Sequence, residues 1–118
     1  MLVYHIRMRE ISILEQQLLD EYVRCERNKR TQEAAIAELP RGYISQKRRG
    51  DKVYAYLQWR EGIKVCSRYL KPEEADIIAR QIEERKSWSK SVKQLARNMA
   101  QIEKVLGKEL IDEYRRSI

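Results

Sequence analysis

Apolar residues recur every three or four positions near both ends of the chain, whereas residue classes alternate one by one between Gly42 and Leu70. The first spacing is typical of an amphipathic helix, and strict alternation is typical of a strand with one buried face. These patterns predict an α+β fold in which a three-stranded antiparallel β-meander is inserted between two long antiparallel helices that form a coiled-coil-like hairpin. We expect a single domain over residues 1–118, with a helix over 10–39, the meander over 42–70, a helix over 72–106 and a short helix over 108–117.

The first predicted helix carries an apolar stripe that Asn28 and Gln32 interrupt midway. Polar residues at such positions weaken a helix seam locally or set its register. Pro40 disfavours helical angles at the residue before it, and Gly42 follows as a second breaker, so the helix is expected to end at Leu39. The stripe consists of Ile11, Leu14, Leu18, Tyr22, Cys25, Ile36 and Leu39.

The second predicted helix has a sharper start and a more regular apolar seam. Pro72 suits the first helical position, and the acidic residues Glu73 and Glu74 favour the positive end of the helix dipole. Spacings of four and three alternate along the seam, which is typical of coiled-coil packing. The seam offers more apolar surface than the first helix can match, which favours a homodimer or a bound partner protein, with a loosely packed monomer as the alternative. Its members are Trp88, Val92, Leu95, Met99, Ile102 and Leu106.

A short final helix is expected after Gly107, a residue that commonly follows the end of a helix. The inward-facing residues of this helix are expected to be Leu110, Ile111 and Tyr114.

Three strands are predicted inside the alternating segment, because Tyr, Val, Ile and Trp are enriched there and glycine-containing turns divide it. We expect two-residue loops at Gly50-Asp51 and Glu61-Gly62, and these loops set the register. The opposed pairs would be Arg48 with Val53, Ile44 with Leu57, Trp59 with Lys64, and Leu57 with Cys66.

This register sorts the meander into two faces. The face expected to rest on a helix carries Ile44, Val53, Ala55, Leu57, Trp59, Cys66 and Leu70, with Gln46, Arg48, Lys64 and Arg68 toward its edges. The other face carries Tyr43, Tyr54, Tyr56 and Tyr69 with Lys47, Arg60, Ser45, Gln58 and Ser67, alongside Ile63 and Val65 near one end.

The charge of the chain is concentrated in the same segment. The 118 residues have a formal net charge of +7. Nine basic and two acidic residues lie between Arg41 and Lys71, which accounts for the whole excess, while the rest of the chain is balanced. Such a concentration attracts a polyanion to one surface.

Other features of the composition exclude whole classes of protein. No apolar run approaches the roughly 20 residues of a membrane span, and the N-terminus lacks the pattern of a secretory signal, so we expect a cytoplasmic protein with no membrane partner. Cys25 and Cys66 have neither a metal-ligand nor a disulfide spacing and are expected to be buried small hydrophobes.

Tyrosines and cations on one sheet face suit nucleic acid, because rings stack on bases or line a groove while Lys and Arg pair with phosphates. The alternative is that the tyrosines are ordinary strand formers whose hydroxyls reach water. The predicted nucleic-acid-binding residues are Lys47, Arg48, Arg49, Lys52, Tyr54, Tyr56, Arg60, Lys64, Arg68 and Tyr69.

The segment over 41–84 also resembles a known DNA-binding module. Its pattern combines Gly42-x-Ile44-x-x-Lys47, a glycine turn, Tyr54-x-Tyr56-x-x-Trp59-Arg60-Glu61-Gly62-x-Lys64-x-x-Ser67-x-Tyr69-Leu70 and Lys71-Pro72-Glu73-Glu74-Ala75. This resembles the arm-type modules of tyrosine recombinases, which consist of a three-stranded sheet and a helix. The resemblance implies a sheet that enters the DNA major groove, with Lys47, Arg48, Tyr54, Tyr56, Arg60 and Arg68 as contacts. The whole chain is also similar to uncharacterised short bacterial proteins of mobile elements that place such a core between two charged helices.

A second cationic stripe is expected on the second long helix. The stripe follows helical spacing and would track a phosphate backbone. The alternative is a solvated face, or one that pairs with Glu15, Glu21 and Glu26 of the first helix. Its members are Lys86, Lys90, Lys93 and Arg97.

Catalysis finds little support in the sequence. His5 is the single histidine, and neighbouring acids such as Glu73 and Glu74 point about 100° apart on a helix. The sequence therefore predicts a non-enzymatic protein with no catalytic residues, no metal site and no cofactor. Its expected partner is nucleic acid, DNA in preference to RNA. The alternative is a protein-interaction module, resembling an antitoxin or a phage inhibitor of a nucleic-acid enzyme, that binds through its coiled-coil helices and basic sheet.

Overall fold

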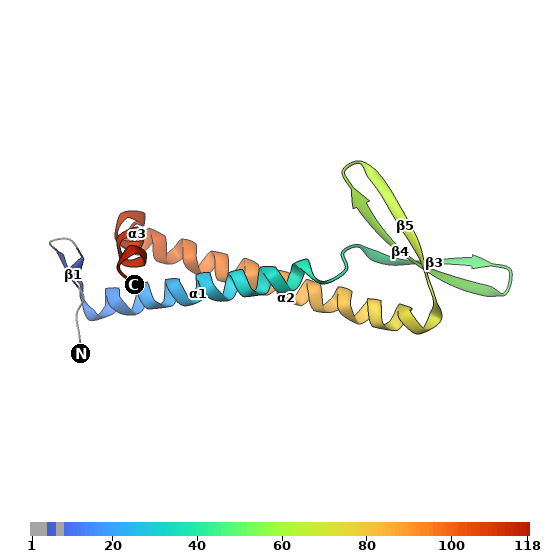
Figure 1. Cartoon of the computed structure of the whole chain (residues 1–118), viewed down its shortest axis with the longest axis horizontal. Coiled ribbons are helices and arrows are strands. Elements are labelled where there is room, and N and C mark those ends of the chain that lie inside the picture. The colour runs from blue at the N-terminus through green and yellow to red at the C-terminus, as the bar shows by residue number, and fades with distance from the viewer. Residues whose placement is uncertain (1–4, 7–8) are drawn as a thin grey trace. The chain divides into compact units, whose positions relative to one another are not determined.

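The computed structural model describes residues 5–6 and 9–118, and in these residues it confirms the α+β class (Figure 1). A three-stranded antiparallel sheet lies in sequence between the first helix and the two that follow it. A second, two-stranded sheet near the N-terminus was not predicted. The elements are β1 (His5–Ile6), β2 (Arg9–Glu10), α1 (Ile13–Ala37), β3 (Tyr43–Arg49), β4 (Lys52–Glu61), β5 (Lys64–Leu70), α2 (Pro72–Leu106) and α3 (Lys108–Ser117).

α1 is shorter at both ends than the predicted helix over 10–39. At its start, Glu10 belongs to β2, and Ser12 forms a capping box with Glu15. The Ser12 hydroxyl accepts the Glu15 N–H and the Glu15 carboxylate accepts the Ser12 N–H, both at 3.1 Å. Since these bonds satisfy backbone donors that have no partner inside a helix, they define the first turn. At its other end the helix tightens into i→i+3 turns that reach Leu39.

The chain divides into two compact units, of which Ala34–Ser89 form one and the described residues before and after them form the other. The core of the latter unit joins α1, the end of α2 and α3. The Tyr22 hydroxyl of α1 donates to Glu103 of α2 at 2.7 Å, and Cys25 lies beside Asn98, so the two helices run antiparallel here. The buried residues of this core are Ile11, Leu19, Tyr22, Ile102, Leu110, Ile111 and Tyr114.

The predicted stripe of α1 is wrong at Leu14, whose side chain is 64% exposed, and it omitted Leu19, which is fully buried. The correction has a physical reason: α3 packs on α1 and selects the side of the helix that becomes buried. Gln16 of α1 is buried with it and donates to the Tyr114 hydroxyl of α3 at 3.0 Å. The prediction that Leu110, Ile111 and Tyr114 face inward is confirmed.

α2 begins at Pro72, as predicted. A second capping interaction stabilises this start, in which the Lys71 N–H donates to the Glu74 carboxylate at 2.9 Å. Arg68 lies 3.6 Å from the same carboxylate. Both neighbours favour the charged form and hold the pKa of Glu74 below its ordinary value, the Lys71 bond being the larger cause.

The β3–β4 hairpin has the predicted register, with Arg48 opposite Val53 and Ile44 opposite Leu57. In the β4–β5 hairpin the predicted register is wrong by two residues, since Trp59 lies opposite Cys66 and Leu57 opposite Arg68.

The reason for this shift is the turn. The loop is Gly62-Ile63 rather than Glu61-Gly62, and Gly62 takes the first loop position with φ +64°, the value of Gly50 in the other turn. Because the shift is an even number of residues, the strand residues keep their predicted faces. Ile63, which was predicted near one end of the tyrosine face, lies in the turn instead.

The unit formed by Ala34–Ser89 has its own small core, in which one face of the meander rests on the first turns of α2, as predicted. Leu57, Leu70 and Ile82 are buried at its centre. The segment before the meander is held in place by Arg85, whose guanidinium donates to the Leu39 carbonyl at 3.0 Å. Within the part of the chain that the structure describes, no helix has the length and apolar character to cross a membrane.

Candidate nucleic-acid interface

The face of the meander turned away from α2 gathers most of the predicted binding residues. We call it the tyrosine face, and its members are Tyr43, Ser45, Lys47, Arg49, Lys52, Tyr54, Tyr56, Gln58, Arg60, Val65, Ser67 and Tyr69. The opposite, apolar face carries the remaining predicted residues, Arg48, Lys64 and Arg68. The structure therefore brings together seven of the ten predicted contacts and separates three from them.

Three tyrosines form a contiguous cluster in the middle of the tyrosine face. Tyr56 lies directly opposite Tyr69, with ring centroids 5.7 Å apart and planes at 66°, and Tyr54 lies 6.1 Å from Tyr69 at 58°. The Lys47 ammonium is 5.0 Å from the Tyr56 centroid. Edge-to-face packing of this kind is favourable for aromatic rings, and so is a cation over a ring.

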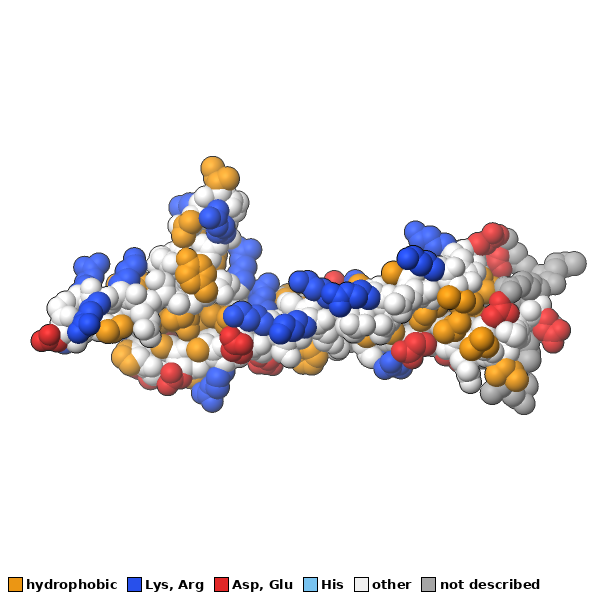
Figure 2. All heavy atoms as spheres, turned by 180° about the vertical axis from the view of Figure 1, so that it is seen from behind, with side chains coloured by type: hydrophobic (Ala, Val, Ile, Leu, Met, Phe, Trp, Pro, Cys, Tyr) orange, Lys and Arg blue, Asp and Glu red, His pale blue; other side chains and the backbone are white. Residues whose placement is uncertain are grey.

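The tyrosine face has four cations and no acid. They are Lys47, Arg49, Lys52 and Arg60, all exposed. The two acids of the meander lie elsewhere, Asp51 in the first turn and Glu61 on the apolar face, where it accepts the Trp59 indole N–H at 3.0 Å. Figure 2 shows Lys and Arg side chains over the meander.

The three remaining predicted contacts have partners or positions that turn them away from this surface. Arg68 lies beside Glu74 at the start of α2, and Arg48 donates to the Gly50 carbonyl at 3.3 Å. Lys64 lies opposite Glu61 across the second hairpin. Strand alternation predicts the same separation, because the three positions have the opposite parity, although all three are among the predicted contacts.

The ends of the two hairpins differ in chemistry. β3 covers β4 up to Gln58 and β5 covers it from Ala55, so each hairpin end is a two-stranded ribbon, and the two ribbons diverge in Figure 1. The first ribbon is basic, and the second ends in Ile63, which is 98% exposed. The sequence pattern assigns Ile63 no role, although an isoleucine is unusual in a tight hairpin turn.

The predicted second stripe on α2 is partly engaged by neighbours on the same helix. Lys86 lies 3.3 Å from Glu83, and Arg97 donates to Gln94. The acids suggested as its partners on α1 are occupied elsewhere. Glu21 pairs with Arg24, and Glu26 pairs with Arg115 of α3. Lys90 and Lys93, the other two members, are exposed.

Half of the predicted seam is used inside the chain. Ile102 is buried, and Met99 and Leu106 pack against it in the core formed with α1 and α3. Trp88, Val92 and Leu95 are half-buried. The seam therefore serves first as an intramolecular interface, and it leaves less apolar surface for a second chain than the sequence pattern indicated.

The described residues were compared with the needs of a metal site and of a reactive thiol. They contain no group of three or more His, Cys, Asp or Glu side chains placed to hold a metal ion. Cys25 is a buried free thiol, and burial raises its pKa, so it is a poor nucleophile. Cys66 is free and only half-buried on the apolar face, so the prediction that it is buried is wrong.

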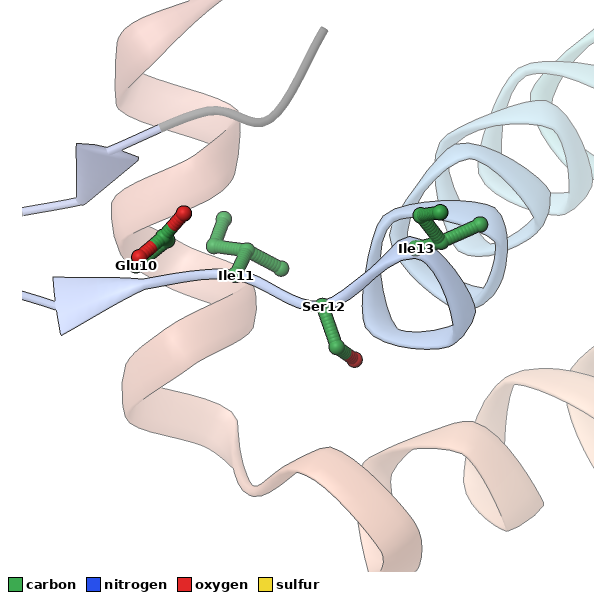
Figure 3. Close-up of a pocket in the computed structure, with 4 residues that line it drawn as sticks. All are labelled: Glu10, Ile11, Ser12 and Ile13. Carbon is green, nitrogen blue, oxygen red and sulfur yellow. The ribbon is translucent and has the colours of Figure 1, made fainter. Parts of the chain in front are cut away.

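A hollow of about 380 Å³ lies at the start of α1 and is lined by Glu10, Ile11, Ser12 and Ile13 (Figure 3). Ile11 is fully buried in the core and Ser12 is engaged in the capping box. The polar atoms of Ser12 are thus committed to the helix, and the hollow supplies no set of converging groups for a ligand.

These observations define a basic α+β protein whose β-meander exposes a tyrosine-rich face. The model of a protein family described as "Domain of unknown function (DUF6788)" matches residues 7–80. The match covers more than half of the chain, and the chain belongs to this family. It includes α1, the complete meander and the first turns of α2. No curated protein and no solved structure matches the chain.

Proposed function

We propose that the protein is a non-enzymatic nucleic-acid-binding protein whose tyrosine face contacts duplex DNA. The observation that carries the proposal is the separation of charge in the meander: four cations and four tyrosines share one exposed face that has no acid. Such a face attracts phosphates at every point, whereas a mixed surface would repel them locally.

The geometry of the sheet favours a duplex over a single strand. The rings of Tyr54, Tyr56 and Tyr69 pack on one another, and Lys47 covers the Tyr56 ring. They are poorly placed to stack on unpaired bases, which need open ring faces. Their hydroxyls remain available as donors to phosphate oxygens, beside the cations.

The width of the sheet also suits a DNA groove. Three strands spaced by about 4.8 Å place the outer two about 10 Å apart, and the major groove is about 12 Å wide. The resemblance to arm-type modules points in the same direction. On this face, groups that suit phosphates outnumber groups that suit base edges. Binding would therefore depend strongly on salt concentration and only weakly on DNA sequence.

The test is binding of a labelled duplex over a series of salt concentrations. The wild-type protein is expected to bind with log affinity falling linearly with log salt. Reversing two charges of the tyrosine face, Lys47→Glu with Arg60→Glu, is expected to abolish binding while the helical circular dichroism stays unchanged.

A matched control keeps the net charge equal to that of the double variant. Lys104→Glu with Lys108→Glu changes two exposed cations near the junction of α2 and α3, and it is expected to retain most of the affinity. Failure of the wild type to shift any duplex or single strand at about 50 mM salt would overturn the proposal in favour of a protein partner. Equal losses in the two double variants would show that net charge alone, and not this face, governs binding.

A further inference from the structure

The two turns of the meander have the same plan but a different second residue. Each has a two-residue loop that opens on a glycine with φ +64°, Gly50 in the first and Gly62 in the second. The next residue is Asp51 in the first turn and Ile63 in the second. Polar residues such as Asp are common in tight hairpin turns, and a β-branched apolar residue is not. Local stability therefore does not account for Ile63.

The surroundings of Ile63 do not bury it. Its side chain is 98% exposed, and Val65, the next apolar residue, is 54% exposed on the tyrosine face. The tip of the β4–β5 hairpin is thus an apolar point at the end of a two-stranded ribbon (Figures 1 and 2). Single exposed apolar residues are common on protein surfaces, so exposure alone assigns Ile63 no role. What distinguishes Ile63 is its position in a tight turn at the end of a narrow ribbon.

Cations flank this point. Arg60 lies opposite Val65, and Lys64 follows Ile63 directly. The one acid of the ribbon, Glu61, is bonded to the Trp59 indole on the other face. This bond also ties Glu61, beside the turn, to Trp59, which packs against the core on α2.

We propose that Ile63 is a wedge that inserts between base pairs of duplex DNA and kinks it, with Arg60 and Lys64 bound to phosphates on either side. This rests on the proposed function. Apolar side chains that enter the minor groove unstack a base step and bend the duplex toward the major groove. Because the β4–β5 ribbon diverges from the other hairpin (Figure 1), its tip would reach the minor groove next to the major groove that the sheet occupies. A narrow ribbon with one apolar residue at its tip and cations beside it has the shape and charge for that role.

Other occupants fit less well. If Ile63 entered an apolar pocket on another protein, the residues around it would be expected to be apolar as well. Instead, the cations Arg60 and Lys64 flank it. A membrane surface would require more apolar area than one turn residue and a half-exposed valine supply.

The test measures binding and bending separately on the same duplex. A duplex of about 30 base pairs carries a donor and an acceptor fluorophore at its ends. Affinity is measured by titration with the full-length protein, and end-to-end energy transfer is compared between variants at saturation. A second duplex carries 2-aminopurine, whose fluorescence rises when its base step is unstacked. The variants are Ile63→Asn, which suits the turn, Ile63→Leu, which restores an apolar tip, and Val53→Ala, which removes an exposed apolar group from the other ribbon.

Wild-type protein, Ile63→Leu and Val53→Ala are expected to raise energy transfer and 2-aminopurine fluorescence. Ile63→Asn is expected to lose more than half of both signals, while its affinity falls by less than about tenfold and its salt dependence is unchanged, because no cation has been removed. Binding without bending by the wild type, or full bending by Ile63→Asn, would overturn the wedge and leave the proposed function standing. Absence of any binding by the wild type would overturn the proposed function itself.

Discussion

The ammonium group of Lys47 lies 5.0 Å from the centre of the Tyr56 ring, and the two residues come from neighbouring strands on the tyrosine face. A cation–π contact holds the ammonium group in place without neutralising its charge. Lys47 therefore presents a positioned charge beside the tyrosine cluster, and its contribution to DNA binding should be measurable by itself.

Replacing Lys47 by Gln is expected to reduce the slope of log affinity against log salt by about 0.9, which corresponds to one phosphate contact on B-DNA. The measurement is a fluorescence anisotropy titration at four or more salt concentrations. Arg68→Gln is the matched control, because Arg68 lies on the apolar face beside Glu74. Equal changes in slope for the two variants would contradict the assignment of the tyrosine face as the binding surface.

Gly42 lies too close to β4 to accept a side chain. It has φ +106°, and a Cβ atom there would lie 2.0 Å from the Gln58 carbonyl oxygen. Gly42→Ala combines backbone strain with overlap and is expected to lower the free energy of unfolding by about 3 kcal/mol. Gly50→Ala, at φ +64° with no atom within 4 Å, should cost only about 1 kcal/mol.

Urea unfolding followed by tryptophan fluorescence suits this comparison, since Trp59 and Trp88 both lie in the unit that contains the meander. Similar losses for the two alanine variants would show that the approach of Gly42 to Gln58 is not a tight constraint.

The buried Tyr22 hydroxyl donates to Glu103 and so links α1 to α2. Its environment makes the free energy of unfolding depend on pH in the alkaline range. Burial, reinforced by the bond to Glu103, raises the pKa of Tyr22 to about 12. Because the pKa is raised on folding, this contribution is complete below the unfolded value of about 10 and is lost as the pH rises through about 12.

Tyr22→Phe is expected to lower the free energy of unfolding by about 1.5 kcal/mol at neutral pH and to flatten this alkaline dependence. Urea unfolding at a series of pH values, followed by far-ultraviolet circular dichroism, measures both effects. Tyr43→Phe, whose ring is 58% exposed, should change neither. An unaltered alkaline profile in Tyr22→Phe would show that another group causes the loss.

Glu74 gives the opposite pH dependence at the start of α2. Its pKa is lowered on folding by the Lys71 N–H and by Arg68. Its contribution is therefore present above the ordinary carboxyl value of 4.5 and is lost as the pH falls through the lower, folded value.

The prediction is that Glu74→Ala is less stable than the wild type at pH 7 and that the difference shrinks in acid. Thermal unfolding from pH 7 to pH 3 measures it. Glu73→Ala, one position earlier and exposed, is the control and should show a smaller difference. A difference for Glu74→Ala that stays constant with pH would exclude an effect of its charge.

Local patterns in the sequence were enough to predict the elements and the faces of the meander. Helix and strand periods differ, so the change from one to the other was visible at Gly42 and again at Pro72. Strand alternation assigned most strand residues of the meander to a face, and those assignments hold despite a wrong register in the second hairpin because the shift is two residues.

What the local pattern left open is which of two compatible arrangements is formed. Glycine fits either loop position of a tight turn, so the sequence permitted both Glu61-Gly62 and Gly62-Ile63. The structure has Gly62-Ile63, which pairs Leu70 with Ala55 above Ile82 and places Ile63 at the tip. The candidate wedge is visible only in this register.

By itself, the sequence determined the α+β class, the composition of the tyrosine face and the start of α2, because each depends on neighbours along the chain. Only the tertiary structure decided that Leu19 rather than Leu14 is buried, because α3 packs on that side of α1. It also decided that Arg68 lies beside Glu74 at the start of α2. These outcomes depend on contacts between residues far apart in the chain, which a periodic pattern does not encode.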